Sequence, residues 1–571
     1  MSLQGLSFLT GLIIRIKIIL YTLNKISKNM QWLVCIFAII TVAASHYEHR
    51  VKDITPTKGQ PWPLPQQYAV ESTFFTIQPS NFSFSYTGGC DILNNAMQRY
   101  LKTMFQQDCV KGSVSNKYSK MAKSKPIGSL GELTSLYVWI PGSCEKYPYE
   151  DMDEQYLIKV NTPDYANKAL LYATTVWGAL RGLETFSQLV YPLQSGLFAI
   201  NTSIVLDFPR FSYRGILLDT SRHFIPVPLL LQNLDIMAQT KMNVFHWHIV
   251  DDPSFPYVSK TFPSLSEKGA FNAKTHIYSQ KDVADVIEYA RQRGIRVLVE
   301  FDTPGHTLSW GLGQSDLLTP CYSKESPNGQ FGPVDPSNPN TYSFLKSFFK
   351  EISTVFPENY IHLGGDEVDF SCWKSNPNIT TFMQKHGFGT NYSKLEEYYM
   401  QNLLDIVKSL NKSYIVWQEV FDNNVQIEPD TVIHVWKEED VYGPELAKVT
   451  SSGYKAILSS CWYLNYISYG IDWPKFYGCD PQNFTGNEKQ KNLVIGGEAC
   501  MWGEHVDASN VISRTWPRAA AVAERLWSSS TVNSTAEAGP RLEELRCNLI
   551  KRGFKVEPVN GPGYCECDYL V

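Results

Sequence analysis

Two neighbouring carboxylates follow a pair of glycines in the stretch HLGGDEVDFSCW, which begins at His362. Asp366 and Glu367 come directly after Gly364 and Gly365. Neighbouring side chains on a regular strand face opposite sides of the sheet, so a bend at the glycines would let both carboxylates face one cavity. The other possibility is that Asp366 caps a helix while Glu367 faces solvent. The first arrangement would give a site capable of acid–base chemistry.

Eight apolar, β-branched runs that could position this pair recur along residues 206–571, and each ends in polar or aromatic residues. They cover residues 214–223, 244–252, 295–306, 360–367, 413–420, 431–440, 455–465 and 492–504. Helical patterns separate most of them, for example at residues 228–241 and 281–294. Eight alternating strands and helices predict a (β/α)8 barrel, an α/β fold whose active site lies at the carboxyl ends of the strands. A doubly wound open sheet is the alternative, but no Gly-x-Gly-x-x-Gly turn follows the first run.

Residues 61–205 differ from the rest of the chain in their sequence pattern and predict a separate, smaller α/β domain. The segments SLYVWI and QYLIKVN, at residues 135–140 and 155–161, are typical of strands. Residues 165–190 carry apolar side chains spaced three and four apart, which predicts a helix over that whole range. A chain of 571 residues is long enough to give both domains a substantial core.

The residues at the carboxyl ends of the eight runs are mostly acids and aromatics, with one arginine and one histidine. They are Asp219, Arg222, Asp251, Asp252, Asp302, His306, Asp366, Glu367, Trp417, Glu419, Trp436, Glu438, Trp462, Tyr463, Asn465, Trp502 and Glu504. Any one acid after a strand could be a helix cap, but the whole set is hard to explain as caps. Acids beside flat rings favour a polyol such as a sugar. The net charge of -5 argues against a nucleic-acid partner, which would require a basic face.

His246 and His248 lie two residues apart in the run at 244–252, so they share one face of a strand. Paired histidines at this spacing can bind zinc in barrel hydrolases, but such a site needs further ligands. At the ends of the other runs, we expect only Glu504 and His306 to lie near enough to serve as partners. We therefore expect histidines packed in the core or behind the site, and no metal.

The first 45 residues are typical of a targeting segment. An apolar run from Trp32 to Val42 is preceded by lysines and followed by small residues, which predicts signal cleavage near Ser45 and translation from Met30. A signal anchor in the membrane is the alternative, but the run is short for a span. After residue 50 no window is long and apolar enough to cross a bilayer, so we expect no stable membrane span in the mature chain.

Cysteines and glycosylation sequons also indicate the secretory pathway. No Cys-x-x-Cys pairs with another at zinc spacing, so the cysteines behind the signal favour disulfides in an oxidising compartment. Seven Asn-x-Ser/Thr sequons together indicate a glycoprotein. They lie at Asn81, Asn201, Asn378, Asn391, Asn411, Asn483 and Asn533.

A sugar ligand would constrain the roles of Asp366 and Glu367. Ordinary retaining glycosidases use an acid and a nucleophile about 5 Å apart, on either side of the bond that breaks. Sequence neighbours are poorly placed to flank a bond in this way. Either a distant acid is the nucleophile, or the substrate supplies its own.

Seven ordered motifs resemble those of the family 20 glycoside hydrolases: RGILLDTSRHF, NVFHWHIVDDPSFPY, FDTPGHTLSW, HLGGDEV, CWYLN, GGEACMWGE and WPRAAAVAERLW. Within that family the chain is most similar to animal lysosomal β-N-acetylhexosaminidases of the α/β-chain type, from about residue 61 to the C-terminus. The resemblance implies an α/β domain at 61–205, a catalytic barrel over the remainder, and no cofactor. It also implies removal of terminal β-linked GlcNAc or GalNAc, in which the substrate's own acetamido carbonyl attacks the anomeric carbon and forms an oxazolinium ion.

The same resemblance implies a role for each catalytic residue. Glu367 would act as the general acid and then as the base. Asp366 would hold the acetamido N–H and stabilise the positive charge that develops on it. An ionised Asp366 would also help to keep Glu367 protonated. Asp251 and His306 would form a relay that tunes Glu367.

Roles in substrate binding follow in the same way from matched positions. The residues are Arg222, Trp417, Trp436, Trp502, Tyr463, Asn465 and Glu504. The arginine would make a forked contact to the O3 and O4 hydroxyls, and the three tryptophans would wall the acetamido pocket. The tyrosine would donate to the acetamido oxygen, and the last two residues would bind O4 or O6.

The resemblance also implies a set of disulfides. The matched pairs are Cys90–Cys144, Cys321–Cys372 and Cys547–Cys565. Cys461 and Cys479 have no counterpart in the human-type pattern, which leaves them available to pair with each other. The resemblance assigns no partner to Cys109, Cys500 or Cys567.

The substrate and the partners follow less directly from the family. Its members form dimers that complete each site across the interface, so we expect a homodimer acting on a glycan or glycolipid, in the lysosome or outside the cell. Tyr466 stands where human-type chains carry Arg or an apolar residue, which favours neutral over acidic substrates. Two other function classes stay open: an inactive sugar-binding glycoprotein and a metal-dependent barrel hydrolase.

Overall fold

The computed structural model describes residues 57–106, 128–193, 197–437 and 442–570. These ranges, apart from residues 562–564, belong to one compact unit. The targeting segment expected at residues 1–45 lies outside the described residues. None of the helices in the described ranges is long and apolar enough to cross a membrane.

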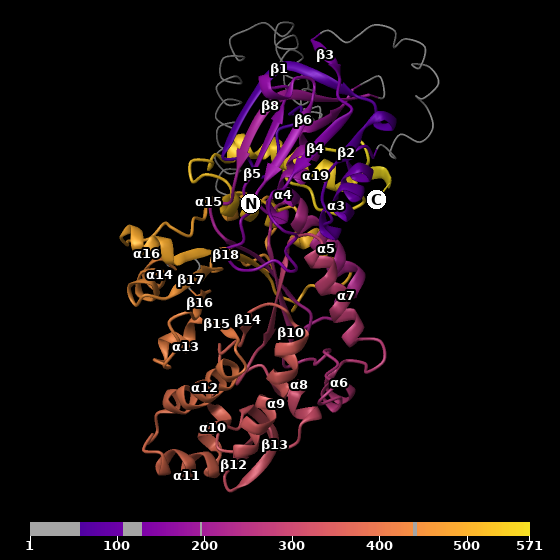
Figure 1. Cartoon of the computed structure of the whole chain (residues 1–571). Coiled ribbons are helices and arrows are strands. Elements are labelled where there is room, and N and C mark those ends of the chain that lie inside the picture. The colour runs from indigo at the N-terminus through magenta and orange to yellow at the C-terminus, as the bar shows by residue number, and fades with distance from the viewer. Residues whose placement is uncertain (1–56, 107–127, 194–196, 438–441, 571) are drawn as a thin grey trace, which may run out of the picture. The chain divides into compact units, whose positions relative to one another are not determined.

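A mixed eight-stranded sheet forms the first domain, with seven strands in the order β2-β4-β6-β5-β8-β1-β3 and β7 paired to β8 (Figure 1). The strands are β1 (Gln67–Ile77), β2 (Ser83–Ser85), β3 (Ser129–Glu132), β4 (Ser135–Trp139), β5 (Tyr156–Val160), β6 (Ala169–Ala173), β7 (Val190–Pro192) and β8 (Phe198–Asp207). Helices α3 (Asp91–Met104) and α4 (Val176–Leu189) pack on this sheet and share one apolar core with it. The strands predicted at 135–140 and 155–161 are confirmed as β4 and β5.

The single helix predicted over residues 165–190 is wrong in its first part. Ala169–Ala173 forms β6, which pairs in parallel with β4 and antiparallel with β5. Helix α4 starts only at Val176, after Thr175, whose side chain accepts a hydrogen bond from the Gly178 amide. The run ALLYA is buried at four of its five positions, so its pattern suits an interior strand as well as a helix. Pairing with distant strands decides between the two.

Eight parallel strands close into a barrel in the order β9-β10-β11-β14-β15-β16-β17-β18. They are β9 (Tyr213–Asp219), β10 (Val244–Val250), β11 (Arg296–Phe301), β14 (Tyr360–His362), β15 (Ser413–Trp417), β16 (Val432–Val435), β17 (Lys455–Leu458) and β18 (Val494–Met501). Parallel pairing of β18 with β9 closes the barrel, with Gly496 opposite Tyr213. Each strand coincides with one of the eight runs in the sequence, so the predicted (β/α)8 barrel is confirmed.

Helices follow the barrel strands, and neighbours pack together, as α5 does with α7 and α9 with α12. The longer ones are α5 (Val227–Gln239), α7 (Gln280–Arg291), α9 (Pro339–Val355), α12 (Tyr392–Ser409), α14 (Tyr442–Ser451), α18 (Arg518–Trp527) and α19 (Thr535–Lys551). The shorter ones are α6 (Ser264–Gly269), α8 (Leu308–Gly313), α10 (Ser371–Ser375), α11 (Pro377–Lys385), α13 (Gln418–Asp422), α15 (Trp473–Gly478), α16 (Glu488–Leu493) and α17 (Val511–Thr515). A hairpin of β12 (Leu318–Ser323) and β13 (Ser326–Val334) lies between α8 and α9 in the chain, and single 3-10 turns occur at Pro79–Asn81, Pro163–Tyr165 and Asp568–Leu570.

The barrel interior is layered along its axis. One apolar residue from each strand forms the layer nearest the amino-terminal ends: Tyr213, Val244, Leu298, Tyr360, Ile415, Val432, Ile457 and Ile495. The next layer is polar and has no exposed surface: His246, Glu300, His362, His434 and Glu498. Aromatic residues lie beyond it, at and after the carboxyl ends: Trp417, Tyr463, Trp436 and Trp502. Charges inside a barrel are costly unless they are paired, so the polar layer marks the end of the barrel where chemistry is expected.

Disulfides join four pairs of cysteines among the described residues. They are Cys90–Cys144, Cys321–Cys372, Cys461–Cys479 and Cys547–Cys565. The structure thus has the three pairs that the resemblance implied, and it pairs the two cysteines that lacked a counterpart. Cys567 is also disulfide-bonded, whereas Cys500 is a free thiol buried within β18.

Six of the seven sequon asparagines are exposed. They are Asn81, Asn378, Asn391, Asn411, Asn483 and Asn533. Asn201 lies on β8 and is half-buried, and its side-chain oxygen accepts a hydrogen bond of 2.8 Å from the Tyr191 hydroxyl. The six exposed positions are therefore open to a glycosyltransferase, and Asn201 is less so.

Candidate active site

The backbone bends sharply just after β14, which ends at His362. Gly364 and Gly365 have φ angles of 68° and 95°, in the region that favours glycine. A Cβ atom on Gly364 would also collide with the carboxylate of Asp302, which accepts a hydrogen bond of 3.0 Å from the Gly365 amide. Both the bend and this close approach require glycine.

Asp366 and Glu367 line the same pocket, which has a volume of about 180 Å³. Asp366 is 8% exposed, whereas the side chain of Glu367 is 60% exposed and so lies toward the opening. The other lining residues are Arg222, His306, Trp417, Trp436, Tyr463, Asn465, Tyr466, Trp502 and Glu504. They follow the carboxyl ends of the barrel strands, as the sequence predicted for this fold. Of the candidate catalytic and substrate-binding residues, the pocket includes all except Asp251.

Asp251 lies directly behind the pocket and is 1% exposed. One carboxylate oxygen is 3.3 Å from Nδ1 of His306, and the other accepts a hydrogen bond of 2.8 Å from Nε2 of His248. The second oxygen is also 2.8 Å from the Arg222 guanidinium. Although burial opposes ionisation, these partners hold the pKa of Asp251 well below its usual range. Asp251 is therefore an anion that anchors two residues of the pocket.

His306 bridges Asp251 and the carboxylate pair. Its backbone has a φ of 55°, which is uncommon for a residue with a side chain. Its Nε2 atom lies 3.7 Å from Asp366 Oδ2 and 3.7 Å from Glu367 Oε2. Although burial opposes the charge, the hydrogen bond to Asp251 and the carboxylates of Asp302 and Asp366 raise the pKa of His306 to about 11. His306 is thus a cation held between anions.

Asp366 is a buried carboxyl group of the pocket whose pKa is raised. Burial raises the pKa of Asp366 to about 6; the charge of His306 opposes this rise, and the charges of Glu419 and Glu300 add to it. Its Oδ1 atom is buried and has no hydrogen-bond partner among the described residues. A buried acceptor without a partner is costly, so this atom is suited to receive a donor from a ligand.

Tryptophan side chains wall the pocket, and two are tethered through the indole N–H. Trp417 donates to Glu300 at 2.8 Å, and Trp436 donates to Glu419 at 2.9 Å. The Nε1 atom of Trp502 is buried and has no partner among the described residues. Flat, anchored rings of this kind provide a rigid apolar surface for a small ligand group.

Arg222 follows β9 and lies over the ring of Trp502, with its guanidinium carbon 5.2 Å from the ring centroid. Asp219 and Asp251 hold it at 3.2 and 2.8 Å. Asp219 also accepts a hydrogen bond of 2.9 Å from the Gly503 amide, so it joins the ends of β9 and β18. Despite burial, the two carboxylates raise the pKa of Arg222, which leaves a fixed cation with part of its surface open to the pocket.

Tyr463, Asn465 and Tyr466 come from the loop after β17. Burial raises the pKa of Tyr463 well above its usual value, so its hydroxyl is neutral and can donate. The side-chain oxygen of Asn465 is buried and has no partner among the described residues. Tyr466 is 51% exposed, and its ring centroid lies 5.6 Å from that of Tyr463. Tyr466 therefore extends the aromatic wall of the pocket toward solvent, and Glu504 adds an exposed carboxylate to the pocket lining.

Several other strand-end residues lie elsewhere. Asp252 accepts a hydrogen bond of 2.9 Å from the Leu308 amide, and the indole of Trp462 donates to the Phe476 carbonyl at 2.9 Å. Glu438 lies outside the described residues. The first two therefore stabilise the loops around the pocket, which is the capping role that the sequence left open for single residues.

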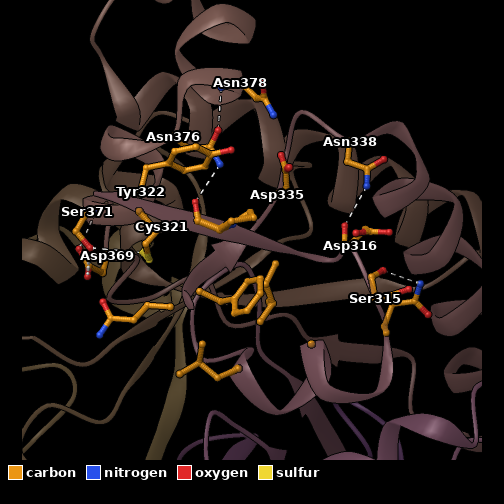
Figure 2. A pocket seen from close by; sticks show the side chains of 18 of the residues that line it. Ser315, Asp316, Cys321, Tyr322, Asp335, Asn338, Asp369, Ser371, Asn376 and Asn378 are labelled. Atoms are coloured by element: carbon orange, nitrogen blue, oxygen red, sulfur yellow. Dashed lines mark hydrogen bonds between the residues drawn. A yellow bond between two sulfur atoms is a disulfide. The ribbon is translucent and has the colours of Figure 1, made fainter. Parts of the chain in front are cut away.

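Asp369, the third acid of the opening stretch, faces a different and larger cavity of about 1090 Å³ (Figure 2). Its carboxylate accepts hydrogen bonds of 2.8 and 2.7 Å from the amide and hydroxyl of Ser371, at the start of α10. Other polar side chains in Figure 2 are also paired, since Asn376 donates to the Pro320 carbonyl at 3.0 Å. Asp369 is therefore hydrogen-bonded to the first residue of α10 and lies apart from Asp366 and Glu367.

Glu300 and His248 support the pocket from behind, and neither is among the site residues predicted from the sequence. Glu300 lies within β11 in an otherwise apolar run, VLVEF, so it is not at a strand end. A charged residue inside a buried strand is unusual unless it is paired. The acidic residue in this apolar run is therefore the feature of the sequence that could have identified Glu300. His248 was expected to lie in the core or behind the site, and the structure places it between Glu300 and Asp251.

His246, His362 and His434 bring their ring nitrogens within 4.8 Å of one another in the polar layer. His246 lies 2.7 Å from Glu498 and 3.0 Å from Glu300, so two carboxylates already occupy its nitrogens. Burial lowers the pKa of His434 to about 3, so that ring is neutral and packs flat on Trp417. These contacts assign the three histidines to the hydrogen-bonded interior of the barrel.

Comparison with known families gives two matches along this chain. The catalytic domain of glycosyl hydrolase family 20 matches residues 211–530, and a "beta-acetyl hexosaminidase like" domain matches residues 61–189. The two ranges correspond to the barrel and to the sheet domain that precedes it.

Curated relatives are similar over most of the chain. Beta-hexosaminidase subunit alpha of Bos taurus is 52% identical over 516 residues, which cover 89% of this chain and 95% of that protein. Beta-hexosaminidase subunit beta of Homo sapiens is 51% identical over 512 residues, covering 88% and 89%. Among solved structures, the chitobiase of Flavobacterium johnsoniae aligns with a TM-score of 0.74 and 32% identity, over 87% of this chain and 74% of that one.

Proposed function

This chain belongs to glycosyl hydrolase family 20, and from that premise we propose that it removes terminal, non-reducing β-linked N-acetylhexosamines from glycoconjugates. The chain is a glycoside hydrolase of the β-hexosaminidase type. The observation that carries the assignment is the placement of Asp366 and Glu367 in one small pocket walled by tryptophans. A pocket of this size accepts one sugar unit at the end of a chain, which fits an exo-acting enzyme.

We assign the nucleophile to the substrate. The acetamido carbonyl oxygen attacks the anomeric carbon while Glu367 gives its proton to the glycosidic oxygen, so the leaving group departs as an alcohol. The product of this step is an oxazolinium ion. Water then attacks the anomeric carbon, Glu367 takes back a proton, and the acetamido group is restored. Two attacks from opposite faces leave the β configuration retained.

Asp366 supports this chemistry as an anion beside the acetamido group. Its Oδ1 atom has no hydrogen-bond partner among the described residues, and it is placed to accept the acetamido N–H. Charge that develops on that nitrogen is stabilised by a fixed, buried carboxylate. His306 lies 3.7 Å from both carboxylates and keeps Asp366 ionised near neutral pH.

The walls orient the sugar for this attack. Trp417, Trp436 and Trp502 enclose the acetamido methyl, and the Tyr463 hydroxyl donates to the acetamido oxygen. Holding that oxygen near the anomeric carbon converts a bimolecular displacement into an intramolecular one.

Residues at the pocket's edge bind the remaining hydroxyls of the sugar. Arg222 binds O3 and O4, and Asn465 and Glu504 bind O4 or O6. Tyr466 offers no positive charge at the pocket's edge, so we assign neutral glycan substrates to this site.

Hydrolysis of a chromogenic β-N-acetylglucosaminide by the purified chain tests this function. Release of the chromophore that survives a strong chelator supports it. Binding of the sugar without turnover would instead indicate an inactive sugar-binding glycoprotein. Activity lost on chelation and restored by a metal would indicate a metal-dependent hydrolase.

We further propose that the chain acts as a homodimer through the loop after Tyr466. Ile467 is 76% exposed, Tyr469 is fully exposed and Ile471 is 55% exposed, and these three residues, here called the apolar ridge, follow the pocket residue Tyr466 in the chain. Exposed apolar patches of this kind mark interaction surfaces. The relatives are named as subunits, which also favours an oligomer.

Replacing Ile467 and Tyr469 together by Ser is expected to convert the dimer to a monomer, because the ridge would lose its apolar surface. Sedimentation velocity measures this directly. Phe271 is 52% exposed and lies in the loop after α6, so Phe271→Ser is the matched control and should leave the dimer intact. A dimer that survives the double change, or a monomeric wild-type chain, would contradict this interface.

The secretory pathway is the compartment that fits the described cysteines, because disulfides persist in an oxidising lumen. We assign the lysosome as the destination, with residues 1–45 as the signal segment. Six exposed sequon asparagines support glycosylation on that route.

A further inference from the structure

Glu300 is a fully buried carboxylate on which four side chains from three barrel strands converge. Its Oε2 atom is 2.7 Å from Nδ1 of His248 and 3.0 Å from Nε2 of His246. Its Oε1 atom accepts a hydrogen bond of 2.8 Å from the Trp417 indole and is 3.1 Å from Nδ1 of His362. Each oxygen therefore serves a different part of the surrounding site.

One oxygen of Glu300 fixes the wall of the pocket. The Trp417 ring lies flat on His434, with 4.2 Å between centroids and 25° between planes. Stacking alone leaves a ring able to slide or rotate in its own plane. The hydrogen bond from the indole to Glu300 removes that freedom, so it sets where the edge of the ring meets the acetamido group.

The other oxygen of Glu300 begins a chain that ends at the catalytic acid. His248 donates to Glu300 through Nδ1 and to Asp251 through Nε2, at 2.7 and 2.8 Å. Asp251 holds His306, whose other ring nitrogen faces Glu367 at 3.7 Å. Fixing His248 at its far side therefore fixes the carboxylate that orients His306.

The charge of Glu300 is essential to this arrangement. Although burial opposes ionisation, the charges of His362 and His248 hold the pKa of Glu300 well below its usual range. Burial also opposes charge on His248, yet Glu300 and Asp251 raise the pKa of that ring well above its usual value. An anion, a cation and a second anion thus stand in line behind the pocket, and each is fully paired.

We propose that Glu300 is a positioning residue that sets the acetamido wall and the support of the catalytic acid at the same time. This inference rests on the proposed function, because it gives a purpose to the wall and to the acid. Glu300 is remote from the sugar, yet in this arrangement it controls both acyl-group recognition and proton delivery.

The test compares Glu300→Gln with wild-type enzyme on two pairs of substrates. The first pair has the same leaving group and differs in its acyl group, N-acetyl or the larger N-butanoyl. A loosened Trp417 admits the larger group, so the ratio of kcat/KM for N-butanoyl over N-acetyl is expected to rise by about tenfold or more, since displacements of ~1 Å change rates on the order of 10²-fold.

The second pair keeps the N-acetyl group and differs in the leaving group, 2,4-dinitrophenol or methanol. Only methanol needs a proton to depart. Weakened proton delivery should therefore lower kcat for the methyl glycoside at least about tenfold more than kcat for the dinitrophenyl glycoside, within the roughly 10²–10⁴-fold range of general acid catalysis.

Three matched variants separate the two effects. Trp417→Phe keeps a ring but loses the indole donor, so it should change acyl selectivity alone. His248→Gln interrupts the chain to Asp251, so it should change leaving-group dependence alone. Glu498→Gln alters another buried carboxylate of the polar layer, bonded to His246 and Tyr213 at 2.7 and 2.5 Å, and should show neither signature.

Uniform loss in Glu300→Gln across all four substrates, as in Glu498→Gln, would overturn the inference. If Glu300→Gln does not fold, Glu300→Asp retains the charge but shortens the reach, and the same two signatures are expected of it. A wild-type chain inactive on every N-acetyl substrate would instead refute the proposed function.

Discussion

Replacing Glu367 with Gln is expected to lower kcat on a methyl β-N-acetylglucosaminide by roughly 10²–10⁴-fold, the range that general acid catalysis supplies. The amide cannot protonate the leaving oxygen in the first step or accept a proton from water in the second. The fold should be unaffected, because the Glu367 side chain is 60% exposed and its ion-pair neighbour, His306, is 3.7 Å away. Steady-state kinetics on purified protein with an unchanged melting temperature provides the measurement.

Asp369→Asn is the matched control for that experiment. Asp369 lies two residues from Glu367 in the same stretch, but it accepts a hydrogen bond from Ser371 at the start of α10 and faces the cavity in Figure 2. The Asp369→Asn enzyme should retain wild-type kcat. A folded Glu367→Gln enzyme with the same rate as Asp369→Asn would remove Glu367 from the mechanism.

Asp366→Asn is expected to lower kcat/KM by about 10²–10³-fold, the effect of losing one preorganised electrostatic contact to the transition state. Asn would turn a neutral group toward the acetamido nitrogen, where an anion is needed as positive charge develops. The loss should be similar for good and poor leaving groups, because Asp366 acts on the nucleophile and Glu367 acts on the leaving group. This contrast separates the two carboxylates by their kinetics.

The pH profile of kcat/KM gives Asp366 a second signature. Burial raises the pKa of Asp366 to about 6, with the charges of Glu419 and Glu300 adding to the rise and His306 opposing it. The mechanism needs the ionised form, so the rate should fall as the pH is lowered through that pKa, and this limb should lie above the ordinary aspartate value of about 3.9. Asp366→Asn should lack the limb. A mutant that keeps it would assign the titration to another group.

The barrel could be predicted from the sequence because each of its strands is a local apolar run and helical patterns separate most of these runs. The strand β6 could not be predicted in the same way. Ala169–Ala173 runs directly into a helix, and its strand form depends on pairing with β4 and β5 far along the chain. The spacing of apolar residues therefore predicts an element when the adjoining segments have a different period. It fails when two adjoining elements both fit the same period.

The pocket residues could be predicted because a barrel brings strand ends together regardless of their separation in sequence. The support behind them could not, because Glu300 and His248 lie inside strands, where side-chain contacts depend on register. Trp462 shows the opposite case, a residue at a strand end that does not face the pocket. It follows β17 beside Tyr463, but its indole donates to Phe476 behind the loop and not into the pocket.

The layered interior explains how one barrel can hold so many charges near a reactive centre. Apolar residues close the amino-terminal end, paired histidines and carboxylates fill the middle, and tethered tryptophans form the surface on which we propose that the sugar binds. Each buried charge in the middle layer has a partner on another strand, which offsets the cost of desolvation. The same partners fix the geometry on which an intramolecular attack depends.

The central claim is that the substrate's acetamido oxygen, and no residue of the protein, displaces the leaving group. Its most direct test compares two chromogenic glycosides that differ only at C2, one bearing an N-acetyl group and the other a hydroxyl. Rapid hydrolysis of the first and no enzyme-dependent hydrolysis of the second is the expected result. Comparable rates for the two, with a sugar bound covalently to the protein during turnover, would contradict the claim.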